Sequence, residues 1–128
     1  MLVSSLIAYP LVEADFSVYF SKLPSSLECP EPVVLVEGPF EREGRMSGEE
    51  RGTVPVICYV VRKINAEAEA DALECERIVR AFGWEARREA GTWRIAGIDT
   101  TAPSFKERDS SGRYLWEFGI EVTAVREI

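Results

Sequence analysis

Residues 113–124 read Arg-Tyr-Leu-Trp-Glu-Phe-Gly-Ile-Glu-Val-Thr-Ala, and this stretch alternates between apolar and polar side chains. One face of the alternation carries the apolar set Tyr114, Trp116, Phe118, Ile120, Val122 and Ala124. The other face carries Arg113, Glu117, Glu121 and Thr123. A period of two is typical of a strand with one face on the core and the other facing water or another subunit. The stretch therefore predicts the principal half-buried strand of a β-sheet.

Other segments carry weaker strand signals. Residues 54–61, Val-Pro-Val-Ile-Cys-Tyr-Val-Val, are apolar on both faces, as expected for a central strand with Pro55 at its edge or start. Shorter strands are predicted for residues 15–21, 33–36 and 92–98, the last with a bulge at Gly97. The turn Asp109-Ser110-Ser111-Gly112 then leads into the principal strand.

The clearest helix is predicted for residues 66–82. Its apolar stripe has helical spacing and consists of Ala68, Ala72, Cys75, Ile78, Val79 and Phe82. Asn65 is a suitable N-cap and Gly83 a suitable end, while Leu73 projects away from the stripe. A shorter helix over residues 1–9 is predicted to stop at Pro10.

These elements predict one α+β domain spanning residues 1–128. It has an antiparallel or mixed β-sheet of about five strands, packed by one main helix and a short N-terminal helix. The chain is long enough to bury a core without crosslinks. Three cysteines at wide spacings fit neither a disulfide framework nor a zinc site, which predicts synthesis in a reducing cytoplasm. The apolar run at residues 2–7 is too short for a signal peptide or a membrane span.

Charge and residue types narrow the possible functions. The net charge is −7 with no basic stripe, so specific nucleic-acid binding is not expected. The chain has no histidine, which removes the commonest general base and metal ligand. There is no phosphate-binding glycine loop, dinucleotide fingerprint or nucleophile elbow. We expect no enzyme activity, cofactor or metal site, although Asp99, with Thr100 and Thr101, remains open as a base or magnesium ligand.

Residues 41–52 form an unusual charged segment. They contain three glycines, seven charges and one apolar side chain, Met46. Such a composition predicts a mobile loop, or an arm that orders only against a partner. Together with the outward-facing residues of the helix and the principal strand, it supplies the candidate subunit interface: Arg42, Arg45, Met46, Glu49, Glu50, Arg51, Leu73, Glu117 and Glu121. For Glu117 and Glu121, a solvated face remains the alternative.

The order of the elements resembles a known family. Residues 18–24, Val-Tyr-Phe-Ser-Lys-Leu-Pro, are followed by a proline-containing link and then by residues 33–38, Val-Val-Leu-Val-Glu-Gly. This opening looks like that of phage tail terminator and tail completion proteins. The apolar strand 56–61, the alanine-rich helix 66–82 and the closing strand through Arg126 and Glu127 are similar too.

The resemblance implies a small virion protein made in the cytoplasm of a bacterial host. It would form a ring, usually a hexamer, that ends the tail tube and joins it to the head, so its partners would be further copies, tail-tube proteins and head-connector proteins. A head–tail connector or minor capsid role is equally compatible. Two alternatives remain open: a small ligand-binding or regulatory domain with a pocket lined by Tyr59, Trp93 and Trp116, and an enzyme that uses carboxylates.

Overall fold

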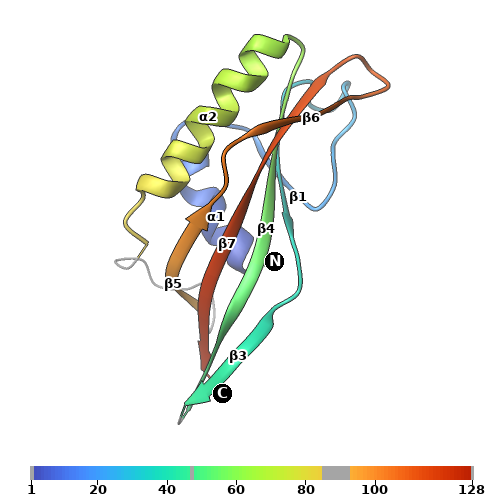
Figure 1. Ribbon diagram of the computed structural model, residues 1–128. Coiled ribbons are helices and arrows are strands. Elements are labelled where there is room, and N and C mark those ends of the chain that lie inside the picture. Colours follow the sequence, from blue (N-terminus) through green and yellow to red (C-terminus); the bar gives the residue numbers. More distant parts are fainter. Residues whose placement is uncertain (1, 47, 85–92, 128) are drawn as a thin grey trace.

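The computed structural model describes residues 2–46, 48–84 and 93–127. These residues form an α+β fold with a mixed sheet of seven strands and two helices (Figure 1). The helices are α1 (Leu2–Glu13) and α2 (Asn65–Ala81), and the strands are β1 (Val18–Phe20), β2 (Val33–Glu37), β3 (Glu41–Met46), β4 (Glu49–Arg62), β5 (Trp93–Thr100), β6 (Ser104–Arg108) and β7 (Tyr114–Glu127). The predicted class is confirmed, with more strands than the five expected.

Two long strands organise the sheet. β4 and β7 have 14 residues each and pair antiparallel along their whole length, from Glu49↔Glu127 to Arg62↔Tyr114. On its other edge β4 pairs with β2 and β3, and β7 pairs on its other edge with β5 and β6. Because each long strand is about twice the length of its outer neighbours, each edge holds two short strands in succession. β1 adds to β2 in parallel.

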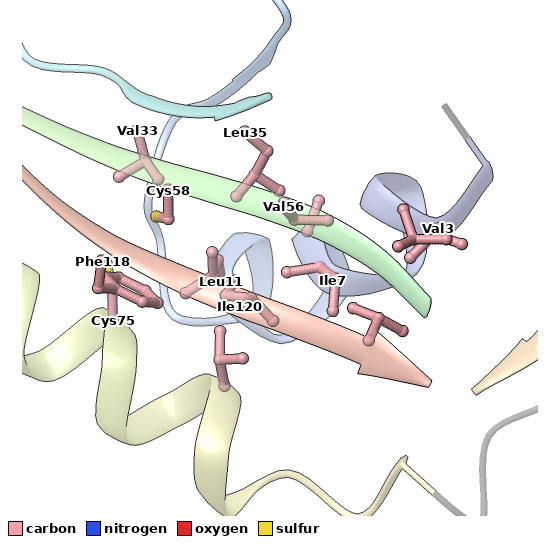
Figure 2. Packing of buried hydrophobic residues seen from close by; sticks show 14 of the residues in the cluster. Val3, Ile7, Leu11, Val33, Leu35, Val56, Cys58, Cys75, Phe118 and Ile120 are labelled. Atoms are coloured by element: carbon pink, nitrogen blue, oxygen red, sulfur yellow. The ribbon is translucent and has the colours of Figure 1, made fainter. Parts of the chain in front are cut away.

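Both helices pack on the same face of the sheet. Val3, Ile7 and Leu11 follow one face of α1, and Ala72, Cys75 and Val79 follow one face of α2; all are buried. They meet the alternate residues Val56 and Cys58 of β4 and Phe118 and Ile120 of β7 (Figure 2). The predicted helical stripe and the predicted alternation of the principal strand are therefore confirmed. Burial of these side chains is the main stabilising contribution to the fold.

The opposite face of the sheet is covered by neither helix, and we call it the open face. Its residues are the odd-numbered positions of β4 and β7. Ile57 is 37% exposed, Pro55 and Glu121 are exposed, and Tyr59 and Glu117 are half-buried. At the end near the turn 109–112, by contrast, Val61 and Leu115 are buried. The open face is therefore accessible chiefly along the middle of the sheet.

Residues 41–52 differ from the loop or arm that the sequence predicted. β3 and the start of β4 form a hairpin in which Met46 pairs with Glu49, and Gly48 has φ +79°. Residues 49–53 also pair with residues 123–127 of β7 on the other side. The prediction of a loop rested on the small apolar surface that residues 41–52 can bury. The start of β4 is instead held by backbone hydrogen bonds to β3 on one side and β7 on the other, and the composition of the segment does not reveal these partners.

Two prolines lie in positions that the sequence did not predict. Pro10 lies inside α1, which continues to Glu13 although a proline there removes one backbone hydrogen bond. Pro55 lies inside β4 rather than at its start. Its carbonyl accepts the N–H of Gly38 at 2.7 Å, at the junction where pairing with β3 ends and pairing with β2 begins. A missing N–H is tolerated at such a break because no continuous ladder runs there.

The start of α2 also differs from the prediction. The N-cap is Ile64, with no side-chain capping hydrogen bond, rather than Asn65. The side chain of Asn65 instead accepts the indole N–H of Trp116 at 2.9 Å, tying the beginning of the helix to β7. The predicted bulge in β5 is confirmed, because the pairing register with β7 shifts between Ile95 and Gly97.

Candidate functional site

The most distinctive surface feature is the end of the sheet where β3 pairs with the start of β4 and the start of β4 pairs with the end of β7. Residues 93–97 of β5 flank the other edge of β7 there. We define the ribbon as β3, residues 49–53 of β4 and residues 123–127 of β7. It extends past the ends of both helices (Figure 1). Six of the nine predicted interface residues belong to it: Arg42, Arg45, Met46, Glu49, Glu50 and Arg51. The side chains of Arg45 and Met46 lie outside the described residues, so only their strand positions are given.

Ion pairs organise the charges of the ribbon. Glu50 is 6% exposed, and its carboxylate lies 4.0 Å from the guanidinium of Arg42, whose side chain is 57% exposed. Glu49 pairs with Arg94 of β5 at 2.9 Å, reaching across β7. Arg51 is exposed and has no ion-pair partner among the described residues. The sequence did not indicate Arg94, because it lies 45 residues from Glu49 and only the strand order brings them together.

The remaining three predicted interface residues lie elsewhere and do not form one surface. Glu117 and Glu121 are on the open face of β7, whereas Leu73 is on the outer surface of α2, 52% exposed. Since α2 packs on the other side of the sheet, Leu73 and the two glutamates face opposite directions. The structure therefore brings together the ribbon residues but separates Leu73 from Glu117 and Glu121.

A third carboxylate joins the acidic residues of the open face. Asp99 of β5 is the register partner of Glu121, and both are exposed. In the part of the chain that the structure describes, Asp99, Glu117 and Glu121 have no ion-pair partner. Like charges directly opposite one another on a sheet are destabilising, so this placement does not serve stability. Lys106, whose Nζ lies 5.7 Å from the ring centroid of Tyr59, adds a positive charge to the same face.

The pocket predicted for the ligand-binding alternative is not formed by the residues named for it. Tyr59 pairs with Glu117 on the open face, whereas the neighbouring pair Val60 and Trp116 points to the helices. Tyr59 and Trp116 are thus on opposite faces because they occupy odd and even positions of paired strands. The side chain of Trp93 lies outside the described residues.

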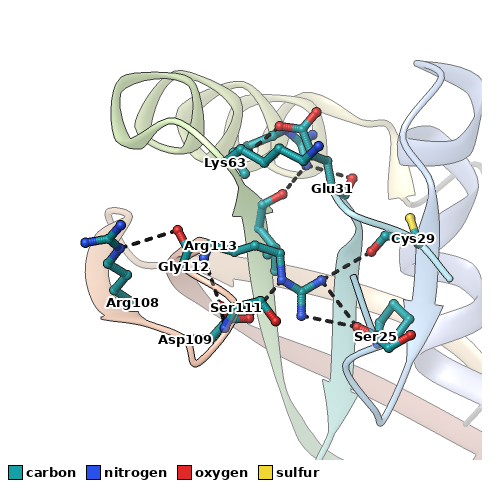
Figure 3. A network of polar contacts seen from close by, with 12 residues as sticks. Ser25, Cys29, Glu31, Lys63, Arg108, Asp109, Ser111, Gly112 and Arg113 are labelled. Carbon is teal, nitrogen blue, oxygen red and sulfur yellow. Dashed lines mark hydrogen bonds and ion pairs between the residues drawn. The ribbon is translucent and has the colours of Figure 1, made fainter. Parts of the chain in front are cut away.

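A hollow of about 820 Å³ is present instead between the segment 22–28 and the turn 109–111. Its principal charged groups are used by the protein itself (Figure 3). Arg113, 5% exposed, donates from Nε to Asp109 at 2.8 Å and from Nη1 to the carbonyls of Pro24 and Cys29 at 3.3 and 3.2 Å. Asp109 Oδ1 also accepts the N–H groups of Ser111 and Arg113. The hollow is therefore bordered by contacts of Arg113 that hold the turn against the segment 22–29. Asp109 shapes the turn as predicted.

The environment of Asp109 shifts its titration. Burial alone would raise the pKa of this carboxyl, but the hydrogen bonds and the positive charge of Arg113 outweigh it, so the pKa lies below its usual value. The burial of Arg113 was not predicted from the sequence. The available signal was a lone arginine four residues after a turn aspartate, at the start of the principal strand.

The carboxylate chemistry left open for Asp99 lacks the expected neighbours. The hydroxyl of Thr100 donates to Glu76 at 2.6 Å, and the hydroxyl of Thr101 accepts the N–H of Gly119 at 2.7 Å. Both threonines thus link parts of the fold. Within residues 2–46, 48–84 and 93–127 there is no group of three His, Cys, Asp or Glu side chains placed to hold a metal ion.

Glu76 provides a testable link between α2 and β5. The hydrogen bond from Arg80, helped by that from Thr100, lowers the pKa of Glu76 below its usual 4.5 despite its burial. We expect Glu76→Gln to lower the free energy of unfolding at pH 7 by about 1–2 kcal/mol. The contribution is fully present above the unfolded pKa near 4.5 and is lost as the pH falls through the lower folded pKa. Urea unfolding between pH 7 and pH 3 measures this difference.

The matched control for Glu76 is Glu74→Gln. Glu74 pairs with Arg77, but both side chains are exposed, so solvent screens the pair and the expected loss of stability is much smaller. A Glu76→Gln variant that loses no more stability than this control, or a loss that does not shrink on acidification, would contradict the assignment.

The three thiols are expected to differ sharply in reactivity. Burial raises the pKa of Cys75 to about 12 and that of Cys58 well above its usual value, whereas Cys29 is half-buried near the surface. Because thiolate is the reactive form, a colorimetric thiol reagent should modify Cys29 alone in the folded protein. All three should react in denaturant. Prompt reaction of two or more thiols in the folded protein, or of any thiol in a Cys29→Ser variant, would refute this.

Comparisons with known proteins add no family. No protein-family model matches the chain, and no curated protein matches it at a significant level. Neither α1 nor α2, the helices of the described part of the chain, is long and apolar enough to cross a membrane.

Proposed function

We propose that this chain is a structural virion subunit of the phage tail-terminator type, which closes into a ring on the end of a tail tube. The observation that carries the proposal is the ribbon. It projects past the helices, carries charges on paired strands and has a free edge along β3. A sheet edge that projects in this way is suited to contact another protein.

The arrangement of the chain gives further support. The elements β1, β2, β4, α2 and β7 follow one another in the order that the family resemblance implies. The net charge of −7 suits a channel through which DNA must pass without being held. In this proposal the partners are further copies, tail-tube proteins and head-connector proteins, and a head–tail connector or minor capsid role belongs to the same class of assembly.

The mass of the purified protein in solution tests the proposal. Light scattering coupled to gel filtration should give a discrete multiple of the 14.4 kDa chain, with six copies as the ring size implied by the resemblance. Addition to polymerising tail-tube protein should shorten the tubes and leave the protein at their ends. A chain that stays monomeric at high concentration and neither binds nor shortens tubes would overturn the proposal.

A second candidate, a small ligand-binding module, is favoured by one observation. The hollow of about 820 Å³ lies within the size range of ligand sites, about 300–1,000 Å³. Of its four charged lining residues, Asp109 and Arg113 are paired with each other and hold the turn in place, whereas Lys22 and Glu28 are exposed. A monomer whose thermal unfolding shifts upward with small anionic or aromatic compounds would favour the ligand-binding role.

A further inference from the structure

The open face carries carboxylates that the fold itself does not use. Asp99 and Glu121 are exposed and are direct register partners, and Glu117 lies four residues before Glu121 on the same face of β7. None of the three has an ion-pair partner among the described residues. Like charges directly opposite one another destabilise a sheet, so this placement lowers the stability of the isolated chain. Local conflicts of this kind are typical of surfaces that serve a function.

Apolar surface lies beside these carboxylates. Ile57 is 37% exposed and is flanked in register by Gly119, which adds no side chain, and by the half-buried Val36. A hollow of about 160 Å³ begins there, lined in part by Val34, Val36 and Tyr59. This volume is below the range of small-molecule sites, about 300–1,000 Å³, so the hollow has room for one side chain rather than for a whole ligand.

The cations of the open face lie away from its middle. The Nζ atom of Lys106 is 5.7 Å from the ring centroid of Tyr59, and Arg51 is exposed toward the other end of β4. Pro55, the register partner of Glu121, is four residues from both Tyr59 and Arg51, or about 13 Å along the strand. This exceeds the Debye length of about 8 Å at physiological ionic strength, so these cations offset little of the charge at the centre of the face.

Charge decides between the kinds of molecule that could cover this face. A second copy would bring a chain of net charge −7 against carboxylates, and the arginines of α2 and β5 are already held by glutamates of the same chain. Nucleic acid, with its phosphates, would be repelled. A basic protein segment with an aliphatic side chain complements both the carboxylates and the apolar hollow.

We propose that the open face docks a basic segment of another protein. Its cations pair with Asp99, Glu117 and Glu121, and an aliphatic side chain of the segment enters the hollow beside Val36. The open face is a different surface from the ribbon, so this proposal goes beyond the ring and does not rest on it. In a chain that forms a ring, the ribbon serves the other copies and the open face serves the foreign partner.

Binding of a synthetic peptide tests the docking proposal. The probe is a short, blocked, fluorescent peptide of lysine, leucine and serine, and fluorescence anisotropy measures its affinity for the full chain. Asp99→Asn with Glu121→Gln should weaken binding about tenfold. Glu67→Gln with Glu69→Gln, an equal change of charge at exposed positions on α2, should leave the affinity unchanged. A peptide with serine in place of leucine should bind more weakly than the probe, and one with glutamate in place of lysine should not bind.

Two further measurements locate the contact and test its effect on stability. A photoreactive residue in place of the leucine should crosslink to β2 and β4 near Val36 and Ile57, as identified by mass spectrometry of the digested adduct. Without peptide, Asp99→Asn with Glu121→Gln should raise the melting temperature by a few degrees, because it removes the repulsion. The α2 pair of substitutions should lower it slightly, since Glu67 and Glu69 complement the positive start of the helix.

The outcomes that would overturn the docking proposal are distinct. Equal weakening by both pairs of substitutions, or crosslinks on α2, would show attraction to the net charge alone. A melting temperature that does not rise would show that the opposed carboxylates do not destabilise the fold. Binding that disappears as the chain assembles would show that a second copy covers the face. Light scattering measures the ring separately, so either proposal can fail without the other.

Discussion

Replacement of Arg113 by alanine is expected to lower the free energy of unfolding by about 3–5 kcal/mol, because it breaks a buried ion pair from one side. The side chains of Arg113 and Asp109 are only 5% and 13% exposed. Removal of the guanidinium would leave the Asp109 carboxylate without its cation. It would also leave the carbonyls of Pro24 and Cys29 without a donor. The segment 22–31 and the turn 109–112 would lose the tie that holds them together (Figure 3).

Urea unfolding at pH 7 measures this loss, with Arg77→Ala as the control. Arg77 also makes an ion pair, with Glu74 at 2.6 Å, but both side chains are exposed, so the control should lose far less stability than Arg113→Ala. Arg113→Lys should restore only part of the stability, because an ammonium group cannot reproduce the planar fork that reaches three acceptors. Equal stability of the Arg113→Ala and Arg77→Ala variants would show that the buried tie does not hold the turn.

Local periodicity was sufficient to predict the elements that form the core. The alternation of residues 114–124 and the helical stripe from Ala68 to Phe82 correspond to β7 and α2, and both face inward as predicted. Burial on one face imposes these periods directly on the chain, so the pattern and the structure share one cause. The bulge near Gly97 belongs to the same class, since a glycine within a strand pattern marks a local break in pairing.

Features that depend on distant partners were predicted poorly. The composition of residues 41–52 indicates a loop, but the outcome was decided by β7, whose residues 123–127 pair with residues 49–53. Pro55 is tolerated within β4 only because two short strands meet beside it. Asn65 has the right residue type for a cap, yet the nearby indole of Trp116 takes its side chain. None of these partners is visible within a local window of sequence.

The same limit applies to the candidate site. Among the predicted interface residues of the strands whose side chains are described, Arg42, Arg51 and Glu121 are exposed, Glu49 and Glu117 are half-buried, and Glu50 is buried. The pairing of Asp99 with Glu121 and of Glu49 with Arg94 could not be seen beforehand, because each joins two strands far apart in the sequence. Leu73 was assigned to the same interface as residues 41–52 because an apolar side chain on the outer face of a helix is also unusual. The fold places the two far apart.

Substitution of Gly52 by valine is the second change with a large expected effect, because the ribbon is packed around this residue. Gly52 is buried, and a Cβ added there would collide with the carbonyl oxygen of Glu41 and lie 2.7 Å from Cζ of Phe40. A backbone carbonyl cannot rotate away, so we expect a loss of about 3 kcal/mol in the free energy of unfolding. If the ribbon makes the contact between copies, assembly should be lost as well.

Gly44→Val is the matched control, since Gly44 lies on the same hairpin and a Cβ there would meet nothing within 4 Å. Valine suits an open strand position, so this variant should be as stable as the parent or slightly more stable. Chemical unfolding measures both variants, and light scattering measures their assembly. Comparable stability of the two valine variants would show that β3 does not pack against β4 as described. A Gly52→Val variant that unfolds more readily yet still assembles would place the contact between copies outside the ribbon.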